Sequence, residues 1–90
     1  MRLLFELGRV VSTPAAVAAL KVARVAPQDL LARHQSGDWG DLDAFDRREN
    51  ARALLTGARI LSAYQTAAGK IWIITEADRA STCILRPEDY

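Results

Sequence analysis

The sequence has little cysteine and histidine, and these two shortages exclude several classes of site. Among its 90 residues Cys83 is the one cysteine and His34 the one histidine. No disulfide can form within such a chain, which is typical of a reducing compartment. Four zinc ligands of the usual kinds cannot be assembled from this set either. We therefore expect no metal ion and no cofactor.

An excess of one charge and a long hydrophobic run are also missing. Lys and Arg total 12 and Asp and Glu total 11, a net charge of +1. Nucleic-acid-binding domains usually carry a clear basic excess, so overall charge gives this function no support. The apolar run at the start is shorter than a signal peptide requires, and no stretch approaches a membrane span. We expect a cytoplasmic protein without membrane contact.

What is present indicates one globular α+β domain over residues 1–90. Half of the residues are hydrophobic and 26% are charged, which is an ordinary globular composition. Residues 3–11 alternate like a strand. Thr13-Pro14 then starts a helix to about residue 23, Pro27 starts a short helix through His34, and Asp43 caps a third helix over 44–56.

The last third of the chain has the pattern of β-structure. Residues 59–66 alternate, 67–69 form a hairpin loop, and 70–76 are almost continuously apolar, as in a central strand. Residues 81–85 form the last strand. We predict an N-terminal strand and three helices followed by a three-stranded antiparallel β-meander, with the helices packed on one face of the sheet.

The loop after the second helix is the first candidate site. It contains His34, Asp38, Trp39 and Asp41 between glycines. Histidine is the usual proton-transfer residue near neutral pH, so this loop could hold a general acid or base. The structural interpretation is a helix-capping loop, in which His34 hydrogen-bonds the chain and Trp39 fills the core.

The turn between the last two strands is the second candidate site. It presents Glu76, Asp78, Arg79 and, after the turn, Thr82. Arginine can bind a phosphate through two parallel hydrogen bonds, so Arg79 is a candidate phosphate clamp. The structural interpretation is a polar turn, in which Asp78 bonds its own backbone and Arg79 pairs with an acid.

The third predicted helix carries a further candidate surface. Arg47, Arg48 and Arg52 could contact phosphate or an acidic partner, although a solvated face is the usual explanation. Asn50 lies close to the apolar stripe and must find hydrogen-bond partners if it is buried, from the Asp41 loop or a strand end. Cys83 is expected to be an inert core residue.

Four blocks of the sequence resemble a family of small bacterial proteins. They are residues 33–40 (RHQSGDWG), 59–64 (RILSAY), 71–79 (IWIITEADR) and 87–90 (PEDY). Members of that family occur on plasmids, phages and integrated elements, and some are labelled as a type I restriction modification subunit. The resemblance covers nearly the whole chain and implies no established activity. A methyltransferase needs a doubly wound sheet with a glycine-rich turn, and this chain has neither pattern.

Three functions are compatible with these observations. The leading hypothesis is a non-catalytic interaction protein of a mobile element, which binds a host or element protein through the loop around Trp39 or forms a homodimer through the sheet. The second is a ribonuclease similar in layout to barnase and RelE, with His34 as acid or base, Arg79 on the phosphate, and Glu76 or Tyr64 as the second proton-transfer group. The third is a DNA-binding regulator.

Overall fold

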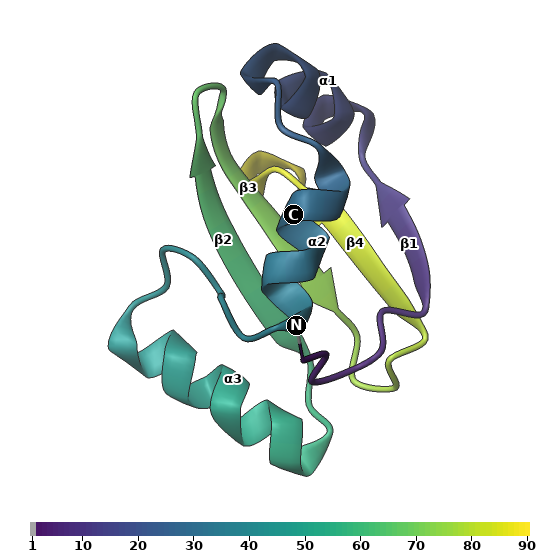
Figure 1. Ribbon diagram of the computed structural model, residues 1–90, viewed down its shortest axis with the longest axis vertical. Coiled ribbons are helices and arrows are strands. Elements are labelled where there is room, and N and C mark those ends of the chain that lie inside the picture. Colours follow the sequence, from purple (N-terminus) through teal and green to yellow (C-terminus); the bar gives the residue numbers. More distant parts are fainter. Residues whose placement is uncertain (1) are drawn as a thin grey trace.

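A computed structural model describes residues 2–90, and it is an α+β structure with one sheet (Figure 1). The helices begin and end close to where the sequence predicted. In chain order the elements are β1 (Arg9–Ser12), α1 (Pro14–Ala23), α2 (Pro27–Gln35), α3 (Ala44–Thr56), β2 (Ile60–Thr66), β3 (Gly69–Thr75), β4 (Ser81–Leu85) and the 3-10 turn η1 (Pro87–Asp89).

Local signals explain the helix boundaries. The side chain of Thr13 accepts a hydrogen bond from the amide of Ala16, and that of Asp43 accepts one from Asp46. These are the bonds of N-cap residues, which satisfy amides that have no partner inside the helix. At the end of α3, Gly57 takes a left-handed conformation with φ of 78°.

The sheet has four strands rather than the three predicted. The expected antiparallel meander of β2, β3 and β4 is present, and β1 adds to it in the order β1-β4-β3-β2, parallel to β4. Gly8 makes this pairing possible. It has φ of 64°, and a Cβ there would lie 2.3 Å from the carbonyl carbon and oxygen of Ala80. Only glycine allows the two backbones to approach so closely.

The first strand is also shorter than predicted, because most of the N-terminal segment packs against α2 instead. The amide of Leu4 donates to the carbonyl of Gln35 at 2.8 Å, and the ring of Phe5 lies edge-on to His34 at 5.0 Å. The alternation of residues 3–7 therefore reflects contacts with the end of a helix. Only residues 9–12 pair with the sheet.

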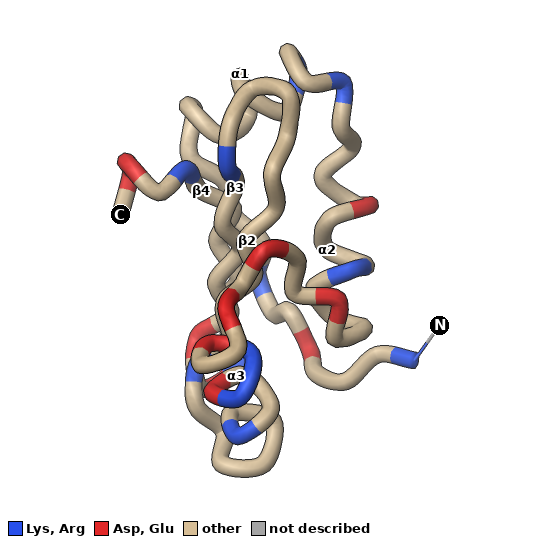
Figure 2. Tube along the Cα trace, turned by 90° about the vertical axis from the view of Figure 1, so that its left-hand side faces the viewer, with Lys and Arg blue, Asp and Glu red and all other residues tan. Residues whose placement is uncertain are grey.

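The three helices do not all pack on one face of the sheet, which corrects the prediction. The main core is formed by α1, α2 and the inner residues of the strands, and its buried members are Ala16, Ala19, Leu20, Leu30, Tyr64, Ile71, Ile73 and Ile84. Helix α3 instead lies beside β2 (Figure 2). Asn50 and Ala53 are its buried residues, while Phe45 and Leu55 are 61% and 90% exposed.

The opposite face of the sheet is covered only in part. Tyr90, which follows η1, packs edge-on against the half-buried Trp72 of β3 with 5.9 Å between ring centroids. The strands β3 and β4 occupy the interior of the sheet, as predicted for residues 70–76. None of the helices in residues 2–90 has the length and apolar character needed to traverse a bilayer.

Candidate functional site

His34 lies at the centre of the first candidate site, in the last turn of α2, and is completely buried. Its Nδ1 contacts the hydroxyl of Ser62, and its Nε2 lies 2.9 Å from the hydroxyl of Thr75. That hydroxyl is 2.7 Å from the hydroxyl of Thr82, which donates to the carbonyl of Leu7 at 2.7 Å. The chain of contacts joins α2 to three strands.

The direction of these hydrogen bonds follows from counting protons. Thr82 gives its single hydroxyl proton to a carbonyl, so it accepts from Thr75. Thr75 must then accept from the Nε2–H of His34, and Nδ1 accepts from Ser62. Each hydrogen-bonding group in this series of contacts has a partner when the imidazole of His34 is neutral. Burial, together with the charge of Arg79, lowers the pKa of His34 to about 4.

This geometry favours the structural interpretation of His34. Both ring nitrogens are bonded within the protein, and no part of the ring is accessible. A general acid or base must come within hydrogen-bond reach of its substrate. In this structure His34 is fully buried and does not meet that condition.

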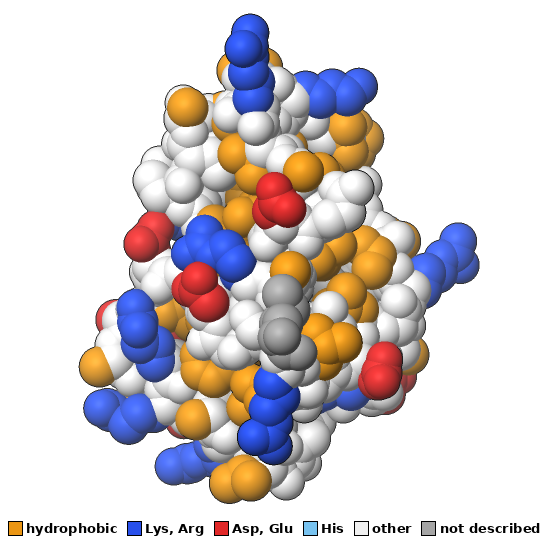
Figure 3. All heavy atoms as spheres, viewed as in Figure 1, with side chains coloured by type: hydrophobic (Ala, Val, Ile, Leu, Met, Phe, Trp, Pro, Cys, Tyr) orange, Lys and Arg blue, Asp and Glu red, His pale blue; other side chains and the backbone are white. Residues whose placement is uncertain are grey.

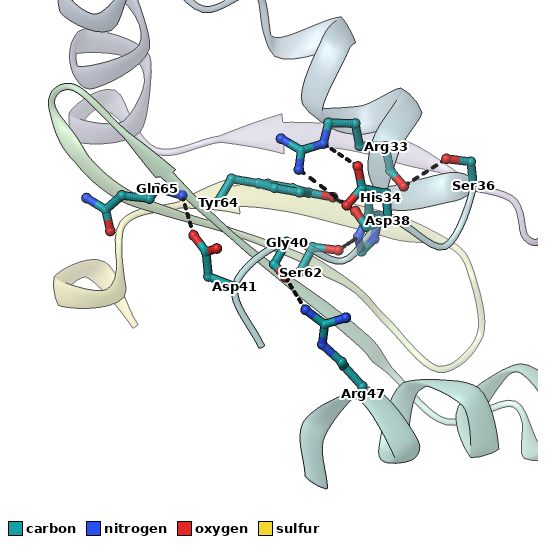
Figure 4. A network of polar contacts seen from close by, with 10 residues as sticks. All are labelled: Arg33, His34, Ser36, Asp38, Gly40, Asp41, Arg47, Ser62, Tyr64 and Gln65. Carbon is teal, nitrogen blue, oxygen red and sulfur yellow. Dashed lines mark hydrogen bonds and ion pairs between the residues drawn. The ribbon is translucent and has the colours of Figure 1, made fainter. Parts of the chain in front are cut away.

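The loop after α2 pairs with the outer edge of β2 through a short parallel bridge at Gly40 (Figure 4). The amide of Ala63 donates to the carbonyl of Trp39 at 3.1 Å, and the amide of Asp41 donates to the carbonyl of Ala63 at 2.7 Å. A carboxylate oxygen of Asp41 accepts from the amide of Gln65 at 3.1 Å. The backbones meet at Gly40, where a Cβ would lie 2.0 Å from the carbonyl oxygen of Ala63.

Side chains hold this loop in place. Asp38 forms an ion pair with Arg33 at 2.7 Å, and the guanidinium lies over the ring of Tyr64 at 4.5 Å. The hydrogen bond from Arg33 lowers the pKa of Asp38, and burial raises that of Tyr64 to about 12. The Tyr64 hydroxyl donates to the Asp38 carbonyl at 2.7 Å. Three candidate site residues, Asp38, Asp41 and Tyr64, are thus brought together.

Trp39 is half-buried in this loop, so its side chain is neither fully in the core nor fully exposed. Its indole nitrogen is buried and has no hydrogen-bond partner within residues 2–90. The backbone carbonyl of Trp39 is the part of the residue that bonds β2.

The residues of the second candidate site, in the turn between β3 and β4, lie in different surroundings. The guanidinium of Arg79 donates to the carbonyl of Ala58 at 2.6 Å and to that of Ala53 at 3.2 Å, so it caps the end of α3. Asp78 accepts from the amide of Ala80 at 2.9 Å, as the polar-turn interpretation predicted. Glu76 is exposed, whereas Thr82 is buried beside Thr75. Arg79 pairs with carbonyls rather than with an acid.

Helix α3 contributes to the β2 edge of the sheet. Arg47 donates to the carbonyls of Gly40 and Leu42, both at 3.0 Å, and so supports the loop. Asn50 finds its partners at the start of β2: its side-chain amide donates to the carbonyl of Leu61 at 2.6 Å, and its oxygen accepts from the Leu61 amide at 3.1 Å. Acidic residues lie among the arginines of this helix (Figure 2).

A groove that was not predicted from the sequence lies at the other edge of the sheet, beside β1. A cavity of about 510 Å³ lies between β1, α1 and α2, and its apolar lining includes Val10, Val17, Leu20, Val25, Leu31 and Ile84. Hydrophobic side chains gather over this region on the right-hand side of Figure 3. The signal in the sequence was the pair Val10-Val11 in a short strand, and both residues are more than 40% exposed.

Comparisons with protein-family models, with curated proteins and with solved structures found no match to this chain. Within residues 2–90, no three acidic, histidine or cysteine side chains are grouped so that they could hold a metal ion. Cys83 is half-buried rather than fully buried, and burial is the largest cause that raises the pKa of its thiol. A thiol with a raised pKa is a weaker nucleophile at neutral pH.

Proposed function

We propose that this chain is a non-catalytic protein-binding module, and that its partner docks along β1 and the adjoining groove. The observation that carries the proposal is the exposed apolar surface at this edge. Val10 and Val11 are 42% and 44% exposed, and the groove beside them is lined mostly by aliphatic side chains. Exposed apolar surface of this kind is typical of a binding site.

The surroundings of the polar candidates support the same proposal. His34 is enclosed, and Arg79 is bonded to backbone carbonyls. Asp38 and Asp41 hold the loop against β2 and are engaged with Arg33 and with the amide of Gln65. A catalytic set would need some of these groups to be free toward a substrate. In this arrangement Glu76 is the one predicted catalytic residue that is exposed.

The family resemblance described above directs the choice of partner. From this resemblance we propose that the partner is a cytoplasmic protein of the host or of the mobile element itself. This part of the proposal depends on the resemblance and not on the groove.

Site-specific photo-crosslinking in producing cells tests the proposal. A photoreactive amino acid at position 10 would face the groove, and the same amino acid at the exposed Lys70, in β3 and outside the groove lining, is the control. We expect one predominant protein adduct from position 10 and none from position 70. That protein, once purified, should bind the wild-type chain in solution. Equal labelling from both positions would contradict the proposal.

Incubation of the purified chain with total cellular RNA tests the ribonuclease alternative. We expect intact RNA. Cleavage by the wild type that Glu76→Gln abolishes would overturn the proposal. This variant is informative because the Glu76 side chain is exposed, so the substitution should leave the fold intact.

A further inference from the structure

We infer that the partner binds through an extended segment that adds a strand to the outer edge of β1, and that this segment carries acidic residues beside alternating apolar ones. This inference rests on the proposed function and specifies the chemistry of its partner. It depends on three features of the β1 edge: its free backbone groups, the groove beside it, and the charges on the groove's rim.

Within residues 2–90, the backbone of β1 has hydrogen-bonding groups that face solvent and have no partner. The amide of Arg9 donates to the carbonyl of Ala80, just before β4, and that of Thr13 donates to the carbonyl of Ile84 in β4. Because successive residues of a strand direct their amides to opposite edges, Val10 and Ser12 direct theirs away from the sheet. All four residues of β1 are exposed, and β1 is one of the two edge strands. An edge of this kind is a template for another strand.

The groove lies where side chains of an added strand would reach. Val10 pairs with Thr82, and Ser12 with Ile84, in the parallel register of β1 and β4. Thr82 and Ile84 face α2 and the core, so Val10 and Ser12 face the same side. A strand beside β1 would therefore direct every second side chain toward the groove. Its volume of about 510 Å³ is enough for several aliphatic side chains.

The charge of the groove favours an acidic partner. Lys21 and Arg24 are part of its lining, which contains no carboxylate. Within residues 2–90 neither of them forms an ion pair, since the two ion pairs there join Arg33 to Asp38 and Arg86 to Glu88. Opposite charges across an interface steer association and select the partner.

A second copy of this chain fits the same edge less well. Its own β1 has the sequence Arg-Val-Val-Ser and would bring no carboxylate. Pairing two such edges would place Arg9 of one copy close to the cationic rim of the other. Like charges at that position oppose association. A separate acidic segment meets both the apolar and the charged requirement.

Selection from a display library of random decapeptides tests the inference. The wild-type chain is one bait, the double variant Lys21→Glu with Arg24→Glu is the second, and Lys70→Glu is a matched control away from the groove. All three positions are exposed, but the double variant places two acidic groups at the C-terminal end of α1, so the melting temperature of each variant is measured before selection. We expect peptides with alternating apolar residues and at least one Asp or Glu, selected by the wild type and the control only.

The strongest selected peptide is then synthesised and titrated in solution. We expect amide shifts in the NMR spectrum centred on Val10 and Ser12, and a loss of affinity of about tenfold or more in the double variant. Two versions of the peptide carry N-methyl groups on alternate amides, one on the odd-numbered residues and one on the even-numbered residues. Only one of the two versions should lose binding, because only one set of amides faces β1.

Three outcomes would overturn the inference: no selected peptides, selected peptides that are basic or helical, and shifts centred away from β1. Size determination in solution adds a fourth, a dimer that forms through β1 and excludes the peptide. None of these would decide the proposed function, because a folded protein could still crosslink at position 10. Conversely, if the peptide binds at β1 but position 10 gives no adduct in cells, the inference about the peptide would stand and the proposed function would be wrong.

Discussion

The two edges of the sheet differ in how their backbone groups are satisfied. At β2 the outward amides of Leu61, Ala63 and Gln65 all have acceptors: the Asn50 side chain, the Trp39 carbonyl and the Asp41 carboxylate. At β1 the outward groups of Val10 and Ser12 face solvent. Proteins usually cover or shorten sheet edges because open ones pair with other chains. In this structure other segments close the β2 edge, whereas the β1 edge is open, and the proposal that β1 receives a partner depends on this difference.

Amide hydrogen exchange should show the contrast directly, with the largest effect. We expect the amides of Val10 and Ser12 to exchange at close to the rate of an open chain. Those of Leu61 and Ala63 should exchange at least about a thousandfold more slowly, since their bonds break only on extensive unfolding. NMR on the uniformly labelled protein measures both sets in one experiment. Comparable rates at the two edges would remove the distinction.

Gly40→Ala should break the closed edge. The new Cβ would meet the Ala63 carbonyl oxygen at 2.0 Å, and φ at this position is 74°. We expect a loss of about 3 kcal/mol or more in the free energy of unfolding, from backbone strain and steric overlap together. Gly57→Ala is the control, because φ is 78° there but no atom lies within 4 Å. It should cost about 1 kcal/mol, and equal losses in urea unfolding would contradict the account.

Acidification should lower the free energy of unfolding through His34, which is buried in the core between the two sheet edges. His34 has a pKa of about 4 when folded and about 6.5 when unfolded, so between these values the unfolded state binds more protons. Stability is complete above pH 6.5 and should fall by about 3 kcal/mol as the pH drops to 4. Urea unfolding across this range measures the slope.

His34→Gln is the matched control for the pH dependence. His34 is the one histidine, so this variant removes the titrating group. Its free energy of unfolding should be lower at neutral pH but nearly constant between pH 6.5 and 5. An unchanged slope would show that other groups cause the pH dependence.

Asn50→Ala should open the part of the β2 edge that no backbone segment covers. The variant loses two hydrogen bonds and leaves the amide and carbonyl of Leu61 without partners. We expect a loss of about 2 kcal/mol. The neighbouring Glu49→Ala is the control and should change stability by less than about 0.5 kcal/mol, since Glu49 is exposed. A small effect at Asn50 would mean that water replaces its bonds.

The smallest effect is expected at the open edge. Val10→Thr keeps the shape of the side chain and changes a residue that is 42% exposed. Its free energy of unfolding should stay within about 0.5 kcal/mol of the wild type, whereas its affinity for the crosslinked partner should fall. A large loss of stability at this position would show that β1 is structural rather than a docking edge.

Local patterns in the sequence were sufficient for much of the fold. Thr13-Pro14, Asp43 and Gly57 mark helix ends through bonds and conformations that involve only near neighbours. The meander was predictable because its strands follow one another and are joined by short turns. Pairing of β1 with β4 was not, since it joins residues more than 70 positions apart.

The candidate site divides in the same way. The sequence alone determined which residues could carry chemistry, because His34, Arg79 and the carboxylates are few and easily recognised. Their surroundings depend on long-range packing: strands β2, β3 and β4 enclose His34, and the carbonyls at the end of α3 engage Arg79. Only the tertiary arrangement decides which sheet edge is closed and which is open, because that depends on which distant segments lie beside each strand.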